Sequence, residues 1–293
     1  MNSSFYCRIF YNYIKLYIFF ISLSFLFCGK QENSSGHQTS SLQKSGTASS
    51  KTHINLATLE WLPYVGEELE NKGYVTELVK EVFQSQGITA DIQFLPFARI
   101  LNMAKEGRID GYFPEYMNEE NKEIYYYSDP YPGGDIGFLK LKKGAYESDS
   151  FKETKDFHSL EKFRIGVVRG YVNTAAFDKA DYLKKEEAAS DLLNLKKLVF
   201  GRVDMIVIDR NVSEYLASRY LGQYNADQSS LQFIEPGLDY KELYTCFSKK
   251  SEYGQYYTQK FNSGLSHLKN TGKLKEILDR NNFLNGRYKN SRN

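Results

Sequence analysis

Gly107-Arg108-Ile109-Asp110 and Gly201-Arg202-Val203-Asp204 are two copies of one short pattern, separated by 201 minus 107, or 94, residues. Each copy follows an amphipathic, helix-like segment (98–106 or 189–200) and precedes a short apolar run (111–113 or 205–208). A glycine just past a helix adopts the left-handed conformation at little cost, and the apolar run after it is typical of a buried strand. The repeat predicts two similar α/β lobes. We expect a cleft between them, with a ligand at the strand ends.

The rest of the chain alternates in the same way. Turn-rich sequence at 128–134 precedes one segment that crosses between the lobes, at 131–138, and a second crossing is expected at 235–243. Strands that alternate with helices indicate a largely parallel sheet. The predicted strands are 54–59, 88–95, 111–114, 136–141, 163–168, 205–209, 231–234 and 243–247. The predicted helices are 74–86, 98–106, 189–200, 253–270 and 274–281.

Residues 1–28 have the pattern of a signal peptide. Arg8 and Lys15 are the only charges before an apolar run at 16–27, which is too short to span a bilayer as a mature helix. Its end resembles the lipobox of bacterial lipoproteins, in which the signal is cut before a cysteine, here Cys28, that receives lipid. Phe27 departs from that pattern, where a small residue is usual. An uncleaved anchor, or an ordinary signal with an incidental cysteine, is the alternative.

Residues 29–51 are rich in Ser, Thr, Gln and Gly and predict a flexible tether. The whole chain has 38 basic and 36 acidic residues, a net charge of +2. Without Arg8 and Lys15 the count is 36 against 36. No basic stripe remains to indicate nucleic-acid binding.

Reactive groups are few. Cys246 is the one cysteine left after Cys7 and Cys28, and its strand-like surroundings predict a small buried hydrophobe. The four histidines form no Ser-His-Asp arrangement, Cys-His pair or metal-ligand spacing, and no phosphate-binding loop is found. We therefore predict no catalytic residue, no metal and no cofactor.

Residues 52–283 resemble the extracytoplasmic solute-binding proteins of family 3, which feed polar amino acid ABC transporters. Four segments carry the resemblance: Trp61-Leu62-Pro63-Tyr64, Leu95-Pro96-Phe97-Ala98-Arg99, Tyr127-Ser128-Asp129-Pro130-Tyr131 and Val168-Arg169-Gly170-Tyr171. The resemblance implies an α/β, two-lobed type II periplasmic-binding-protein fold with two crossover hinge strands and a ligand cleft between the lobes. Lobe 1 is expected to comprise 52–137 and 237–293, and lobe 2 to comprise 138–236.

The resemblance also implies a function. We expect a monomeric lipoprotein, anchored by lipid on Cys28 to the membrane at the periplasmic side of the cell envelope. It captures a small polar solute, an amino acid or related amine, for an ABC transporter permease. One alternative is an enzyme on the same fold, similar to cyclohexadienyl dehydratase, with Glu60, Glu115 and Asp209 as acid and base. Another is a ligand-binding sensor that signals through a partner.

In that family an Asp holds the ammonium group of the ligand, and an Arg holds its carboxylate. Asp209 matches the Asp, although it could instead simply cap a helix that begins at Asn211. Gly170 and Tyr171 match a glycine turn at a helix start, where backbone N–H groups attract a carboxylate. A plain helix entry would give the same sequence.

The family's Arg is missing. Its Thr-x-x-Arg pattern falls on Asn118 and Asn121, and asparagine brings neither a charge nor a bidentate fork. Arg99 is the candidate substitute, and Arg169 is a further option. The alternative for Arg99 is a surface arginine paired with Glu106 or Glu115.

The remaining candidate ligand-binding residues come after the first and third strands. Glu60, Trp61 and Tyr64 should face the cleft, where aromatic rings can stack on a ligand or bind a cation. Trp61 could instead only pack between loop and helix. Phe113 and Glu115 match the segment that contacts the ligand through its backbone, but Glu115 could be a solvated loop charge. The run 125–127, three tyrosines, is interpreted as hinge packing.

Overall fold

The computed structural model describes residues 52–143, 157–224, 228–284 and 287–288. The chain forms two compact units, Met1–Thr47 and Ala48–Asn293, and every described residue belongs to the second. The predicted signal segment with Cys28 and the predicted tether lie outside the described residues. Within the described residues, no helix has the length and apolar character needed to cross a membrane.

One sheet organises the second unit. Its strands are arranged in the order β2-β1-β3-β10-β5-β8-β6-β7, with β4 beside β10 and β9 beside β5. The bounds are β1 His53–Thr58, β2 Thr89–Phe94, β3 Gly111–Glu115, β4 Tyr125–Tyr127, β5 Tyr131–Leu141, β6 Arg164–Val168, β7 Lys184–Ala188, β8 Met205–Asp209, β9 Leu231–Phe233 and β10 Asp239–Ser248. The short strands β11 (Phe283–Leu284) and β12 (Arg287–Tyr288) pair only with each other.

Each lobe is built on three parallel strands. In lobe 1, β1 lies between β2 and β3, and in lobe 2, β6 lies between β7 and β8. Lobe 1 carries α2 (Tyr74–Gln84), α3 (Phe97–Glu106), α7 (Gly254–Asn270) and α8 (Lys273–Arg280). Lobe 2 carries α4 (Ala175–Asp178), α5 (Asp191–Val199) and α6 (Arg210–Tyr220). The 3-10 turns are η1 Glu70–Lys72, η2 Glu120–Glu123, η4 His158–Leu160, η5 Leu221–Tyr224 and η6 Gln228–Ser230.

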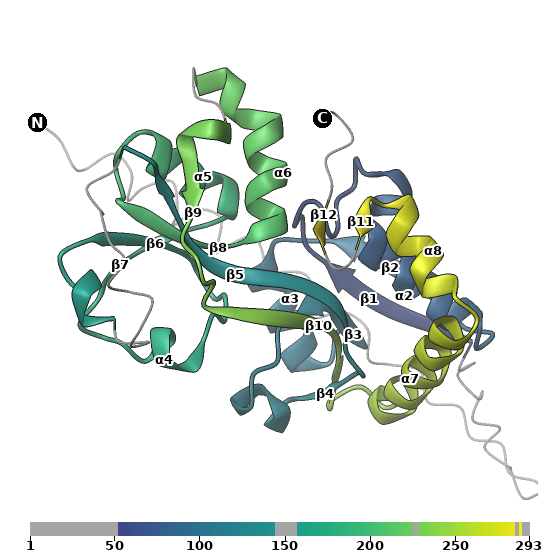
Figure 1. The fold of residues 1–293 in the computed structure, drawn as a ribbon. Coiled ribbons are helices and arrows are strands. Elements are labelled where there is room, and N and C mark those ends of the chain that lie inside the picture. The colour runs from purple at the N-terminus through teal and green to yellow at the C-terminus, as the bar shows by residue number, and fades with distance from the viewer. Residues whose placement is uncertain (1–51, 144–156, 225–227, 285–286, 289–293) are drawn as a thin grey trace, which may run out of the picture. The chain divides into compact units, whose positions relative to one another are not determined.

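Two long antiparallel strands connect the lobes. β5 and β10 lie side by side between the two groups of elements (Figure 1), paired from Tyr131 with Leu243 to Ile136 with Asp239. β10 then pairs with β3 of lobe 1, and β5 pairs with β8 of lobe 2. The predicted two-lobed α/β architecture with two crossing segments is confirmed. Where each lobe ends along the chain stays a prediction.

The repeated glycines end two equivalent helices. Gly107 (φ 74°) comes directly after α3 and Gly201 (φ 65°) comes after the last turn of α5, both in the left-handed region that favours glycine. The N–H of Arg108 donates to the Met103 carbonyl, and the N–H of Arg202 donates to that of Lys197. Both copies therefore close a helix in the same way.

The repeated aspartates tie the next strand to its parallel neighbour. Asp110 Oδ2 accepts from the backbone N–H of Asn55 in β1 (2.9 Å), and Asp204 Oδ2 accepts from that of Arg164 in β6 (2.8 Å). Each donor belongs to the strand beside the one that the motif leads into. The motif therefore has a structural role, since it ties β3 to β1 in lobe 1 and β8 to β6 in lobe 2.

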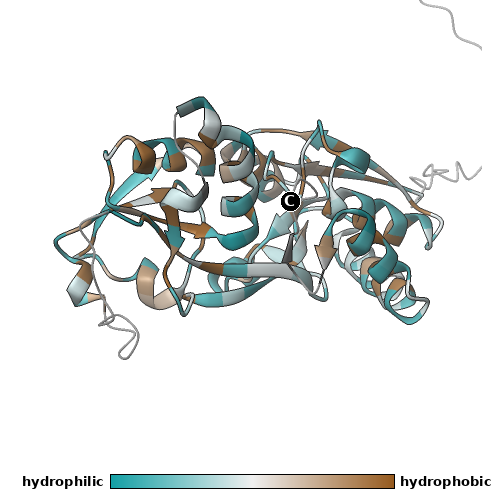
Figure 2. Cartoon of the chain, turned by 45° about the horizontal axis from the view of Figure 1, so that its top comes forward, coloured by the Kyte–Doolittle hydropathy of each residue, from teal (hydrophilic) through white to brown (hydrophobic). Residues whose placement is uncertain are grey.

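Hydrophobic residues concentrate on the strands and on the helix faces that cover them (Figure 2). The larger core cluster includes Leu56 of lobe 1 and Ile206 of lobe 2, and a smaller cluster around Phe138 and Phe177 belongs to lobe 2. Cys246 is fully buried in β10, which confirms its predicted role as a small hydrophobe.

Two strands of the main sheet, β4 and β7, were not predicted from the sequence. β7 reads Lys-Lys-Glu-Glu-Ala and lies beside β6 at the end of the sheet order, so it lacks the apolar pattern that marks strands in sequence. β4, the three tyrosines at 125–127, pairs antiparallel with β10, the crossing strand. These tyrosines, interpreted from the sequence as hinge packing, form a short strand on the end of β10 that also pairs with β3 of lobe 1.

Candidate functional site

Two carboxylates end the two equivalent strands. Glu115 is the last residue of β3 and Asp209 the last residue of β8, and 209 minus 115 is the same 94 residues that separate the two motifs. Both lie beside a crossing strand, since Glu115 pairs with Tyr244 of β10 and Asp209 with Ile136 of β5. The two residues are only 8% and 4% exposed. The duplication thus brings two buried acids to the region between the lobes.

Glu115 is not a solvated loop charge. Its Oε1 accepts from the backbone N–H of Tyr116 (2.8 Å) and its Oε2 accepts from the Tyr112 hydroxyl (3.1 Å). Burial raises the pKa of Glu115 to about 7, against these two hydrogen bonds, which favour the charged form.

Asp209 caps α6 and also joins the two lobes. Its Oδ1 accepts from the backbone N–H of Val212 (3.1 Å), so the helix-cap alternative is correct as a local description, with the helix beginning at Arg210. Its Oδ2 accepts from the hydroxyls of Tyr64 (3.0 Å) and Tyr116 (3.4 Å) of lobe 1. Burial raises the pKa of Asp209 to about 7.

Asp191 is a third buried carboxylate, and the sequence analysis missed it. It is the first residue of α5, after the cap Ser190, and is 6% exposed. Its Oδ2 accepts from the Tyr171 hydroxyl (3.3 Å). Burial raises the pKa of Asp191 to about 6, opposed by hydrogen bonds from Tyr171 and Trp61. The only signal was the Ser-Asp pair at a helix start, which occurs at many helices without a functional site.

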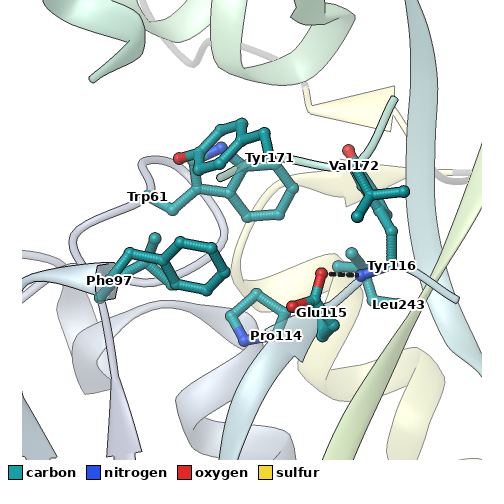
Figure 3. A pocket seen from close by; sticks show the side chains of 9 residues that line it. Trp61, Phe97, Pro114, Glu115, Tyr116, Tyr171, Val172 and Leu243 are labelled. Atoms are coloured by element: carbon teal, nitrogen blue, oxygen red, sulfur yellow. Dashed lines mark hydrogen bonds between the residues drawn. The ribbon is translucent and has the colours of Figure 1, made fainter. Parts of the chain in front are cut away.

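An aromatic cavity lies beside Glu115 (Figure 3), and its wall residues Tyr116 and Tyr171 donate to Asp209 and Asp191. Its volume is about 30 Å³, and its walls carry Trp61, Phe97, Tyr116 and Tyr171 with Glu115. The ring of Trp61 stands nearly perpendicular to those of Tyr116 (84°, centroids 5.7 Å apart) and Tyr171 (84°, 6.5 Å). Phe97 and Tyr171 are also perpendicular (89°, 5.8 Å). Neighbouring rings therefore stand at steep angles to one another along the walls of the cavity.

A larger hollow of about 380 Å³ shares Trp61 and Tyr171 with the aromatic cavity. Four carboxylates line it, those of Glu60, Glu67, Glu68 and Asp191. Among the described residues of its walls, Arg219 is the only basic one, and its guanidinium lies 3.7 Å from Glu68.

None of the arginines predicted to replace the missing family residue lines either space. Arg99 is exposed in the first turn of α3 and lines neither space. The predicted pairing of Arg99 with Glu106 is wrong, because Glu106 pairs with Arg108 at 2.7 Å. Arg169 is exposed and bound to Glu187 at 2.7 Å. The described walls of the aromatic cavity carry no lysine or arginine.

The other predicted residues lie around this centre. Tyr64 is fully buried, stacks on Trp61 (4.5 Å, 20°) and donates to Asp209, so Trp61 both packs and lines the cavity. Phe113 is buried in β3, and its carbonyl accepts from the Thr58 hydroxyl (2.7 Å). Gly170 adopts a positive φ of 81°, and the helix expected to start near 173–174 is α4, which begins at Ala175 with Thr174 as its cap. Asn121 lies in η2 and lines neither space.

The family model of the bacterial extracellular solute-binding proteins, family 3, matches residues 56–283. The chain belongs to this family. The predicted family and its two-lobed fold are thereby confirmed, and membership implies a solute-binding protein that acts outside the cytoplasm. Among curated protein sequences none matches the chain.

Solved structures share the fold of this family-3 chain. A histidine kinase sensor domain with similarity to periplasmic binding proteins has a TM-score of 0.66 and 14% identity, covering 78% of this chain and 95% of its own. The substrate-binding protein of an amino acid ABC transporter has a TM-score of 0.63 and 17% identity, covering 78% and 98%. A mutant of ArgBP from T. maritima has a TM-score of 0.64 and 18% identity, covering 79% and 95%. At these identities the likeness establishes the fold alone.

Proposed function

We propose that this family-3 protein captures a small solute bearing a positively charged amine, an amino acid or a related amine, between its lobes. One observation carries the proposal: buried Glu115 lines an aromatic cavity whose described walls hold no basic residue, and buried Asp209 and Asp191 accept from its wall tyrosines. A buried carboxylate is costly unless an opposite charge or hydrogen bonds compensate it. A cationic solute supplies that opposite charge.

The raised pKa values of the three carboxyl groups also favour a positively charged solute. Burial raises the pKa of all three carboxyl groups, to about 7 for Glu115 and Asp209 and about 6 for Asp191. A cation near a carboxylate favours its ionised form and lowers its pKa. Solute binding near neutral pH therefore recovers part of the electrostatic cost of burial.

Among the three carboxylates, we assign the solute-facing role to Glu115. Glu115 lines the aromatic cavity, whereas Asp209 lies behind the hydroxyls of Tyr64 and Tyr116. Asp209 acts on the solute through Tyr116, which contacts both the cavity and Asp209. Trp61 and Tyr171 complete the solute contacts in the cavity, and Glu60 belongs to the neighbouring hollow, where it would meet any part of the solute that extends past them.

Family membership also supports a place for this activity in the cell. We propose that the protein is a monomer, anchored by lipid on Cys28 at the periplasmic side of the membrane, and that it passes the solute to an ABC transporter permease. Processing at Cys28 is tested by mass spectrometry of the mature protein, which should begin with a lipid-modified cysteine.

Solute binding is tested by thermal unfolding of the protein against a panel of amino acids, amines and carboxylic acids. A ligand at 100 times its dissociation constant stabilises the folded state by about 2.7 kcal/mol. Amines should raise the melting temperature and acids without an amine should not. No shift with any amine refutes the proposal, and turnover of a prephenate-like acid would favour the dehydratase alternative.

A further inference from the structure

We propose that the positively charged group of the solute is a quaternary, fully methylated ammonium, held by the ring faces of the aromatic cavity. This inference rests on the proposed function of the same site. The choice is between a primary and a quaternary ammonium.

Four aromatic side chains line the cavity. Trp61 comes from the loop after β1, Phe97 from the start of α3, Tyr116 from the end of β3, and Tyr171 from lobe 2 (Figure 3). Trp61 stands nearly perpendicular to Tyr116 and Tyr171, and Phe97 stands nearly perpendicular to Tyr171, so rings in different planes line one small space. The face of an aromatic ring is negative, so a cation enclosed by several faces is attracted by each of them.

The side-chain polar atoms named on these walls already take part in hydrogen bonds within the protein. Both carboxylate oxygens of Glu115 accept hydrogen bonds from the protein, and the hydroxyls of Tyr116 and Tyr171 donate to Asp209 and Asp191. Lone pairs remain on Glu115 and on the two hydroxyls, but a primary ammonium carries three N–H donors, and each of them needs an acceptor in the right direction when water is removed. A quaternary ammonium has no N–H group, so it leaves no donor unpaired in the cavity.

The charge of the cavity also fits. Among the described residues of its walls, Glu115 is the only carboxylic acid, and none is a lysine or an arginine. A single carboxylate beneath aromatic walls balances a single diffuse positive charge without requiring a directional hydrogen bond.

The lobes must separate for such a group to enter. A cavity of about 30 Å³ has room for about one water molecule. Lobe 2 supplies only Tyr171 and Val172 to its described walls, whereas Trp61, Phe97, Glu115 and Tyr116 come from lobe 1. Domain closure around a solute is the known motion of periplasmic binding proteins. When lobe 2 moves away, Tyr171 and Val172 leave the cavity, and the walls that belong to lobe 1 stay in place.

Matched pairs of probes test the selectivity. Calorimetry of the protein at pH 8 would compare choline with ethanolamine and trimethylglycine with glycine, because the members of each pair differ only in methylation of the nitrogen. We expect at least one methylated member to bind ten times more tightly than its partner. Equal or tighter binding of the primary amines overturns the inference and leaves the proposed function standing. If the wider panel contains no amine that binds, both fail.

A neutral isostere separates charge from shape. Choline should also bind at least ten times more tightly than 3,3-dimethylbutan-1-ol, which has the same shape with carbon in place of nitrogen. Phe97→Leu keeps an apolar wall but removes a ring, so it should weaken choline about fivefold and leave the neutral alcohol within twofold.

Two further variants test whether the loss of binding is specific to the cation. Trp61→Phe keeps a ring but reduces its cation–π attraction, since tryptophan is the strongest of the three aromatic side chains in this respect. It should weaken choline more than the neutral alcohol. Phe200→Leu is the matched control, because Phe200 is 59% exposed and lies away from the cavity. Equal losses for choline and the alcohol in Phe97→Leu and Trp61→Phe would show a purely hydrophobic site and overturn the inference.

Discussion

Glu115 and Asp209 occupy the same position in the two lobes, yet their surroundings differ. After Glu115 the chain continues as a loop, and the side chain remains at the wall of the aromatic cavity. After Asp209 the chain turns directly into α6, and the side chain caps that helix and accepts two tyrosine hydroxyls from lobe 1. The segment after each duplicated strand, a loop or a helix, therefore decides whether the terminal acid can face a solute or joins the lobes.

The largest expected effect is on the pH dependence of stability. The folded pKa of Asp209 is about 7 against an ordinary value of 3.8, so the folded state binds this proton more tightly than the unfolded state does. Its contribution to the free energy of unfolding is present below about pH 4 and is lost as the pH rises towards 7. The loss is at most about 4 kcal/mol, from about 3 pKa units at 1.36 kcal/mol each.

Asp209→Asn should remove that part of the pH dependence while keeping a helix cap, because asparagine caps as well as aspartate. Urea unfolding at pH 4, 5, 6, 7 and 8 measures the effect. Asp181→Asn, at an exposed aspartate of lobe 2, is the control and should match the unmodified protein. A profile of Asp209→Asn that also matches the unmodified protein contradicts the burial argument.

The second effect separates the two acids in solute binding. Glu115→Gln should weaken the tightest-binding amine about 30-fold or more, because loss of a buried charge partner costs about 2 kcal/mol or more. Asp209→Asn should weaken it less than fivefold, since the tyrosine hydroxyls stand between Asp209 and the cavity. Calorimetry at pH 8 measures both, with the exposed Glu119→Gln as control. A larger loss in Asp209→Asn would give the solute-facing role to the second lobe.

The third effect concerns the hydroxyls that cover Asp209. Tyr64 donates to Asp209 at 3.0 Å and accepts from Asn211 Nδ2 at 2.8 Å, whereas the contact from Tyr116 to Asp209 is 3.4 Å. Tyr64→Phe should lower the free energy of unfolding at pH 8 by about 1.5–3 kcal/mol, and Tyr116→Phe by about 0.5 kcal/mol. The difference should shrink at pH 5, where Asp209 is protonated. Equal losses in both variants would mean that the two hydroxyls share the carboxylate equally.

The sequence predicted the fold well because the repeated motif acts locally. Gly107 and Gly201 end their helices, and Asp110 and Asp204 bind the adjacent strand, through contacts that the order of residues already implies. β7 was missed because its lysines and glutamates carry no apolar pattern.

The site was predicted only in part, because its decisive contacts join distant segments. Trp61, Glu115 and Tyr171 were identified and do meet at one cavity. That Tyr64 covers Asp209, 145 residues away along the chain, depends on how the lobes meet and leaves no local signal. Asp191 was missed for the same reason, since a helix-start aspartate becomes notable only when Tyr171 and Trp61 bury it.

The smallest expected effect tests the arginines that the sequence offered for a ligand carboxylate. Arg99 is exposed on α3, and Arg169 is exposed and paired with Glu187. Exposed substitutions away from a site change stability by less than about 0.5 kcal/mol. Arg99→Gln and Arg169→Gln should therefore leave the affinity for the tightest-binding amine within twofold, measured beside Glu115→Gln. A tenfold loss in either variant would mean that lobe closure brings that guanidinium to the solute, and the cavity would then bind a carboxylate as well as a cation.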